Sequence, residues 1–220
     1  MRCRDRGFTL AELLIAIAVL LLFMGVAYSA LLPVLTYLSP AQAKVNTQQN
    51  AVPLLYKLQR EVRQTDYTAI YVQAAGTTSV LSSLATLTDT TTFAIVSAKT
   101  GAAGSGCFPG GAFSTVPGTG SPLWRGFEVF MLQNGALKCV YEPMSTTYAR
   151  VLDIPASEAT TAITSATGVV NPPVFGSRVL DIKMRADATP FVVDFQIQAV
   201  STVNGRSNAT TYTEDILLRN

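Results

Sequence analysis

Gly7-Phe8-Thr9-Leu10-Ala11-Glu12 stands at the head of a long uncharged run, and this stretch decides the fold. Three arginines lie within the first six residues, and after Glu12 no charged residue occurs before Lys44. The run from Leu13 to Leu38 has 26 residues. As a helix it would reach about 39 Å, which exceeds a hydrocarbon core of about 30 Å. Because the basic residues precede it, we expect a single-pass anchor with a cytoplasmic N-terminus and an exported remainder.

Two residues distinguish this anchor from an ordinary signal peptide. A secretory signal places its apolar region before the cleavage site and loses it, whereas Gly7 precedes the apolar run, which would therefore be kept. A carboxylate such as Glu12 near the head of a membrane helix is costly and usually marks function. In the alternative interpretation, Glu12 lies at the lipid headgroups, where the positive end of the helix dipole makes its charge tolerable.

The segment from Gly7 to Leu14 resembles the class III signal of type IV pilins and type II secretion pseudopilins. The resemblance implies that a prepilin peptidase cuts between Gly7 and Phe8, and that Phe8 becomes the N-methylated N-terminus. It also implies that Phe8 and Glu12 carry subunit assembly, because Glu12 matches the family glutamate that pairs with a neighbouring subunit's N-terminal amine. Pairing makes two groups tolerable that are each expensive in lipid. Ala11 departs slightly from the family pattern, in which a larger aliphatic residue is usual.

Composition limits the other classes of protein. A chain of 220 residues holds one anchor and one domain of ordinary size. Charged residues make up 14%, against about 25% in typical soluble proteins, as a membrane helix and a Ser/Thr-rich exterior would produce. Without residues 1–7, the chain has 13 basic and 13 acidic residues. A neutral mature chain gives no electrostatic indication of nucleic-acid binding.

Cysteine positions predict one disulfide. Cys3 falls in the proposed leader, which leaves Cys107 and Cys139 as the pair in the mature chain. Both lie on the exported side of the anchor, where oxidation is favoured. We therefore predict a Cys107–Cys139 disulfide rather than two free buried thiols, with a stabilisation of about 2–4 kcal/mol.

The helical pattern continues past the anchor. Apolar residues recur at Val45, Val52, Leu55, Leu58 and Val62, which predicts an amphipathic extension packed on a sheet. Three prolines, at positions 33, 40 and 53, should bend the helix or break it locally. We expect four parts: a leader over 1–7, a transmembrane and assembly helix over 8–43, an amphipathic extension over 44–66 and a β-rich head over 67–220.

Within the head the period changes to that of strands. Trp124 to Glu142 predicts a hairpin that turns at Asn134-Gly135, since both turn residues must accept positive φ. The C-terminal part predicts a three-stranded meander covered by the long helix. Its parts are Val179 to Met184, Phe191 to Val200, a turn at Asn204-Gly205 and Thr210 to Leu218. We further expect strands at Thr92–Val96 and Tyr148–Ile154, and loops at Gly101–Pro122 and Glu158–Pro173. The predicted fold class is α+β, a long helix on an antiparallel sheet.

No enzyme is predicted. The chain has no histidine, which removes the commonest general base and most zinc sites. The glycine-rich stretch Gly101–Pro122 lacks the Gly-Lys-Ser/Thr ending of a phosphate-binding loop. We assign no catalytic residue, no cofactor and no metal site. Acidic residues at 181, 187, 194, 214 and 215 could meet across the meander and bind calcium, but a solvated acidic sheet face is the commoner explanation.

Short stretches of the head refine the resemblance. Leu58–Gln64, Gly135–Lys138 and Leu218–Asn220 resemble PilW-class minor pilins and J-type pseudopilins. The resemblance implies a minor subunit at the initiation point or tip of a type IV pilus. Its partners would be other pilin or pseudopilin subunits, prepilin peptidase and an inner-membrane assembly platform. Its location would be the inner membrane first, then a cell-surface or periplasmic filament. A type II secretion pseudopilin is one alternative, and a single-span anchored extracellular binding module is another.

Overall fold

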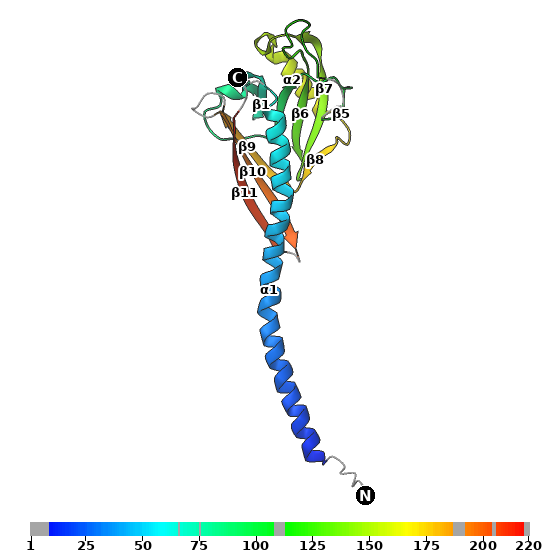
Figure 1. Cartoon of the computed structure of the whole chain (residues 1–220), viewed down its shortest axis with the longest axis vertical. Coiled ribbons are helices and arrows are strands. Elements are labelled where there is room, and N and C mark those ends of the chain that lie inside the picture. The colour runs from blue at the N-terminus through cyan, green and yellow to red at the C-terminus, as the bar shows by residue number, and fades with distance from the viewer. Residues whose placement is uncertain are drawn as a thin grey trace.

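A single helix, α1 (Leu10–Val62), runs from the N-terminal end of the molecule into a β-rich head (Figure 1). The computed structural model describes residues 9–65, 67–74, 76–107, 113–186, 192–203 and 206–217. The predicted cleavage residues Gly7 and Phe8, the Asn204-Gly205 turn and the C-terminal Leu218–Asn220 lie outside the described residues. The observed helix and antiparallel sheets confirm the predicted α+β class.

α1 passes through its prolines without interruption. Helical structure continues across Pro33, Pro40 and Pro53, so of the two expected effects, bending or a local break, the helix shows no break, and it is gently curved (Figure 1). Each proline removes one hydrogen bond to the carbonyl four residues earlier. The turns on either side of each proline remain helical across the missing bond.

Beyond residue 42, one stripe of α1 packs on the head. Its buried members are Ala43, Thr47, Ala51, Leu54, Leu55, Leu58 and Val62. The prediction was correct for the last three residues and wrong for Val45 and Val52, which are 48% and 38% exposed. Small side chains at the first three positions let the helix approach the strands closely. The buried stripe therefore consists of small residues in its first half and of large apolar residues in its second half.

The larger sheet of the head is antiparallel and has seven strands. They are β1 (Ile70–Ala74), β2 (Thr77–Val80), β4 (Thr92–Ser97), β5 (Ser105–Gly106), β6 (Trp124–Gln133), β7 (Ala136–Tyr148) and β8 (Val174–Ser177). The spatial order is β2-β1-β4-β6-β7-β5, and β8 also pairs with β7. The predicted hairpin is β6–β7, in which Gln133 pairs with Ala136. Asn134 and Gly135 have φ values of 52° and 70°, as the turn chemistry requires.

The smaller sheet contains the predicted meander. Its strands are β9 (Val179–Ala186), β10 (Val192–Val203) and β11 (Arg206–Leu217), with β3 (Thr88–Asp89) added at the edge. Val193, Phe195 and Ile197 alternate into the core, as expected. α1 packs against β10 and β11, so the predicted cover of this sheet by the long helix is confirmed.

Two apolar cores surround the larger sheet. The first lies between α1 and the two sheets and includes Leu58, Phe93, Phe130 and Phe195. Phe93 stacks on Phe130 with ring centroids 4.8 Å apart. The second lies on the opposite face of the larger sheet, beneath the short helix α2 (Ala156–Thr167). Burial on both faces explains why all six residues of β4 are buried and why that strand shows no polar alternation.

α2 corrects one sequence interpretation. Glu158–Pro173 was expected to be a loop, but its first ten residues complete a helix of 12 residues that starts at Ala156. Ala159, Ala162, Ile163 and Ala166 are buried at helical spacing. A second correction lies just before it, because the strand expected at Tyr148–Ile154 is the end of β7 followed by the 3-10 helix η3 (Val151–Asp153). The two other 3-10 helices are η1 (Tyr67–Ala69) and η2 (Leu81–Ser83).

Candidate functional site

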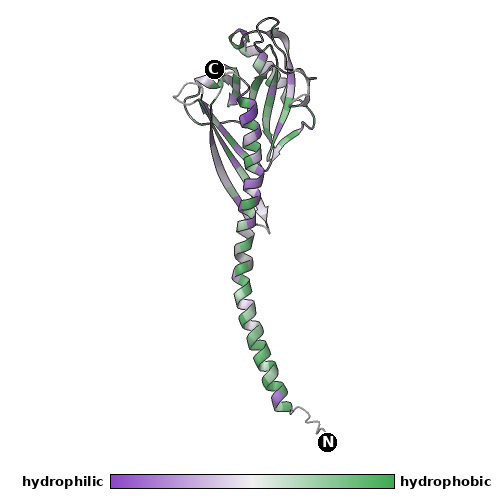
Figure 2. Ribbon diagram, viewed as in Figure 1, coloured by the Kyte–Doolittle hydropathy of each residue, from purple (hydrophilic) through white to green (hydrophobic). Residues whose placement is uncertain are grey.

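The first half of α1 is an apolar rod that stands clear of the head. Leu10–Val34 is long and apolar enough to cross a membrane, with a mean hydropathy of 2.7, and none of it is buried by the rest of the chain. Figure 2 shows this half of the helix as almost wholly hydrophobic, in contrast to the mixed colouring beside the head. An apolar surface of this length needs lipid or other helices around it.

Glu12 closes the N-terminal end of this rod. Its carboxylate accepts a hydrogen bond from the Thr9 amide at 3.0 Å, and the Thr9 hydroxyl accepts one from the Glu12 amide at 3.3 Å. This reciprocal pair is a capping box, which satisfies two amides that a helix start otherwise leaves unpaired. This capping role was not predicted, although Thr9-Leu10-Ala11-Glu12 has the required spacing.

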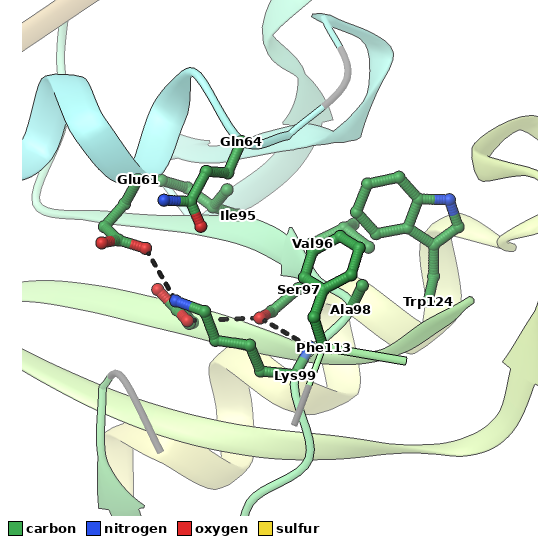
Figure 3. Close-up of a pocket in the computed structure, with 10 residues that line it drawn as sticks. Glu61, Gln64, Ile95, Val96, Ser97, Ala98, Lys99, Phe113 and Trp124 are labelled. Atoms are coloured by element: carbon green, nitrogen blue, oxygen red, sulfur yellow. Dashed lines mark hydrogen bonds and ion pairs between the residues drawn. The ribbon is translucent and has the colours of Figure 1, made fainter. Parts of the chain in front are cut away.

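A second polar group lies where α1 ends against the larger sheet. Glu61 on α1 and Glu128 on β6 are 4% and 3% exposed. Lys99 donates from Nζ to Glu61 Oε2 at 3.1 Å, and Figure 3 shows the two side chains reaching toward each other. Ser97 donates from Oγ to Glu128 Oε1 at 3.2 Å. Arg60 also contacts Glu61, with Nε 2.9 Å from Oε1.

Burial makes the Glu128 carboxyl harder to ionise than it is in water. Burial first, and then the charge of Glu61, raise the pKa of Glu128 from its ordinary 4.5 to about 7, although Lys99 and Ser97 oppose the shift. The cavity beside these groups measures about 10 Å³, roughly the space of one water molecule. The group therefore has acid–base character but no room for a substrate, and it fixes the end of α1 to β4 and β6.

The predicted cysteine pair is bonded in the structure. Cys107 and Cys139 form a disulfide with their Cα atoms 5.3 Å apart, and it ties the segment after β5 to β7. Cys139 also donates its amide to the Pro173 carbonyl at 3.0 Å, so the chain entering β8 is held at the same place. This arrangement forms a covalently fixed corner next to α1.

The described acidic residues of the meander do not gather into a metal site. Asp194 pairs with Arg185, and Asp181 lies 3.7 Å from Lys183. Asp187 lies outside the described residues. Among the described residues, no three His, Cys, Asp or Glu side chains are placed to hold a metal ion. Arg185 and Lys183 are therefore partners of Asp194 and Asp181 in structural ion pairs.

The chain's N-terminus matches one family model, the prokaryotic N-terminal methylation motif, over residues 2–28. No curated protein and no solved structure was found to match the chain. The motif spans the stretch that contains Gly7, Phe8 and Glu12 and runs into the apolar rod. It indicates a type IV pilin-like or pseudopilin-like protein.

The motif and the apolar helix have three consequences. The motif and the single apolar helix fit a membrane-anchored precursor. The motif implies processing by prepilin peptidase and assembly with other pilins. It also suggests a structural subunit rather than an enzyme.

Proposed function

We propose that this protein is a minor pilin-like subunit of a type IV pilus, cut after Gly7, methylated on Phe8 and assembled through α1. The observation that carries the proposal is the methylation motif at residues 2–28 continuing into an apolar helix whose membrane-spanning half is not buried by the rest of the described chain. A bundle of like helices would bury that surface. The mature protein would leave the inner membrane to join a filament, with its head on the outside.

The capping box gives Glu12 a defined place in this assembly. Within one chain its carboxylate satisfies the Thr9 amide, one residue from the proposed new N-terminus at Phe8. A neighbouring subunit's amine placed at the same carboxylate would pair two charges that are each costly in lipid. That pairing would set the axial register between subunits.

The minor role rests on one surface segment. The described residues of the segment, 101–107 and 113–122, contain only the short strand β5 and isolated bridges, and a long irregular segment would be awkward to repeat along a closely packed fibre. The segment at Glu158–Pro173 no longer supports this argument, because most of it is helix α2. The methylation motif alone is equally compatible with a type II secretion pseudopilin, which is the second candidate.

The first test is the mass of the protein recovered from membranes and sheared filaments. We expect the loss of Met1–Gly7 and the addition of one methyl group on Phe8. A protein that keeps all seven residues would contradict the proposal and favour the anchored binding module. Counting this chain against the most abundant subunit of the same filaments then separates a minor subunit from a major one. Loss of protein secretion rather than of pili on deletion would favour the pseudopilin.

Two variants separate the two roles of Glu12. Glu12→Ala removes both the cap and the proposed intersubunit pair, whereas Thr9→Ala removes only the reciprocal hydroxyl contact. We expect Glu12→Ala to abolish incorporation into filaments and Thr9→Ala to retain most of it. Equal loss in the two variants would assign Glu12 to helix capping alone.

A further inference from the structure

The outer edge of β11 is a long strand edge that no other strand covers. β11 lies at one end of the smaller sheet and has 12 residues, whereas the other edge strands, β2, β3, β5 and β8, have two to four. Among the described residues, no backbone hydrogen bond reaches this edge between Ser207 and Thr213. Folded proteins usually shorten or interrupt such edges, because their unpaired N–H and C=O groups attract another strand.

The pairing of the smaller sheet shows which groups of β11 point outward. The Val200 amide of β10 donates to the Arg178 carbonyl, just before β9, at 2.8 Å, so the backbone of Val200 faces β9. Successive residues of a strand direct their N–H and C=O groups to opposite sides, so the next residue, Ser201, faces β11, where its partner is Asn208. The same alternation along β11 points every second residue away from β10. The outward backbone groups between these bounds belong to Ser207, Ala209, Thr211 and Thr213.

This stretch has none of the features that normally protect a strand edge. Ser207–Thr213 contains no proline and no charged residue, and its register with β10 is unbroken. Proline, lysine or a β-bulge would each discourage pairing. The side chains of the four outward residues are all exposed, whereas that of Tyr212 between them packs on the core. The edge therefore offers four N–H and four C=O groups to an added strand.

The direction of β11 limits which chain can supply that strand. Near the C-terminal end of β11, Glu214 accepts a hydrogen bond from Gln59, close to the head end of α1, at 3.2 Å. β11 therefore runs away from the membrane-spanning half of α1, and its lower end lies beside the middle of the helix (Figure 1). Antiparallel pairing of two β11 edges would point the anchors of the two copies in opposite directions, which one membrane does not allow.

The other described edges of a second copy are also poor partners. None of them is longer than four residues, so none can match a stretch of seven. A subunit present at low copy number has mainly other proteins as its neighbours. These two arguments favour a segment of a different subunit.

We propose that the outer edge of β11, at Ser207–Thr213, binds an extended segment of a different filament subunit as a fifth strand of the smaller sheet. This inference rests on the proposed function, because the filament supplies the neighbour. The edge recognises about seven extended, uncharged residues without proline, whose backbone groups complete the hydrogen-bond ladder. The contact fixes the head to its neighbour independently of the helix bundle.

Two proline variants test the edge separately from the strand. Thr211→Pro removes an outward N–H and leaves the bonds to β10 in place. We expect head stability close to that of the unchanged protein, but incorporation into sheared filaments lowered by about tenfold, because a bond to the added strand is lost. Thr210→Pro instead removes an N–H that faces β10, so it should lower the midpoint of head unfolding. Trp124 fluorescence measures the stability of each variant.

Two further variants complete the design. Ala85→Pro is the matched control, because Ala85 is exposed in the connection between η2 and β3 and follows Leu84, whose backbone is already extended. Its incorporation should be unchanged. Ala209→Lys keeps the backbone free of proline, and a lysine on an open edge discourages pairing. Its incorporation should therefore fall, with normal head stability.

Photo-cross-linking identifies the chain that occupies the edge. With p-benzoylphenylalanine in place of Thr211, irradiation of filaments on cells should give adducts that map to one continuous segment of another pilin-like subunit. Thr164, which is exposed on α2 beyond the other face of the larger sheet, is the control position and should not give this adduct. Adducts with an identical copy of the chain, or no adduct, would overturn the proposal.

The outcomes separate the two proposals. A chain that is cut, methylated and present in filaments, but whose Thr211→Pro and Ala209→Lys variants incorporate normally, overturns the edge proposal and leaves the proposed function standing. A chain that remains uncut and absent from filaments overturns both proposals.

Discussion

Replacing Glu128 by glutamine should stabilise the head at neutral and alkaline pH. The side chain is 3% exposed, and the charged groups near it are Glu61, Lys99 and Arg60. Glutamine keeps the shape of the carboxylic acid and can still meet the Ser97 hydroxyl, but it cannot ionise. Lys99, which is half-buried, retains its contact with Glu61 in the variant, so the substitution does not leave it without a partner.

The magnitude comes from the raised pKa. The folded protein binds the Glu128 proton more tightly than the unfolded chain does, because its pKa is about 7 instead of 4.5. Stability contributed by that proton is complete below about pH 4.5 and is lost as the pH rises through 7. At about 1.4 kcal/mol per pKa unit, the ionised side chain costs the folded state about 3 kcal/mol at pH 8.

The assay compares unfolding of the two full-length proteins in detergent at several pH values. Trp124 is the chain's single tryptophan and lines the same cavity, so its fluorescence reports on this part of the head. The chain has no histidine, and no other side chain type ordinarily titrates between pH 5 and 8. From pH 5 to pH 8 the advantage of Glu128→Gln should grow by about 2–3 kcal/mol, or about 5–10 °C in Tm.

Parallel stability curves for the two proteins across this range would refute the reasoning. A less stable Glu128→Gln protein at pH 8 would show instead that Lys99 needs the Glu128 charge more than burial opposes it. Asp153→Asn is the matched control, because it removes the same charge from an exposed position on η3. Its curve should follow that of the unchanged protein.

Three further predictions concern the cores. Gly126→Ala should destabilise the head by about 1–3 kcal/mol, because the added Cβ would lie 2.7 Å from the Glu142 carbonyl oxygen, and thermal unfolding measures the loss. Leu58→Ala should lower the free energy of unfolding by about 2–5 kcal/mol in urea, since the side chain is fully buried between α1 and the sheets. A loss well below this range would contradict its place in the core. Replacing Cys107 and Cys139 by serine should cost about 2–4 kcal/mol and make stability insensitive to reductant; a reductant effect that persists in this variant would contradict the assignment.

Local signals predicted the elements that depend on neighbouring residues. The apolar run predicted the exposed half of α1, and Asn134-Gly135 predicted the β6–β7 turn because few residue pairs accept two positive φ angles. Strict alternation predicted β10 and the side that faces α1. These signals come from contacts between residues close in the chain, or from the alternation of apolar and polar residues in an element with one buried and one exposed face.

Other features depend on packing that a single segment does not reveal. α2 is built from alanine, threonine and serine, so its buried face is marked by small residues such as Ala159 and Ala166, whose hydrophobic signal is weak. Val45 and Val52 looked like core residues, but the close approach of α1 selects Ala43 and Thr47 for burial in their place.

The Glu61–Lys99–Glu128 group could not be predicted because its members come from three segments far apart in the chain. No spacing rule connects α1, the end of β4 and β6. The antiparallel pairing of β4 with β6 brings Ser97 beside Gly126, near Glu128, and the end of α1 brings Glu61. The capping box at Thr9 and Glu12, in contrast, could have been predicted from the spacing of these two residues alone.

The disulfide also limits how far the molecule can stretch. In the proposed filament, tension would enter each subunit through α1, and a head that unfolded would lengthen by the chain it releases. Cys107 and Cys139 are 32 positions apart, a span that would add roughly 110 Å when fully extended. While the disulfide is intact, these residues cannot extend. An unfolding subunit therefore lengthens less between α1 and the C-terminal strand than the same chain would after the disulfide is reduced.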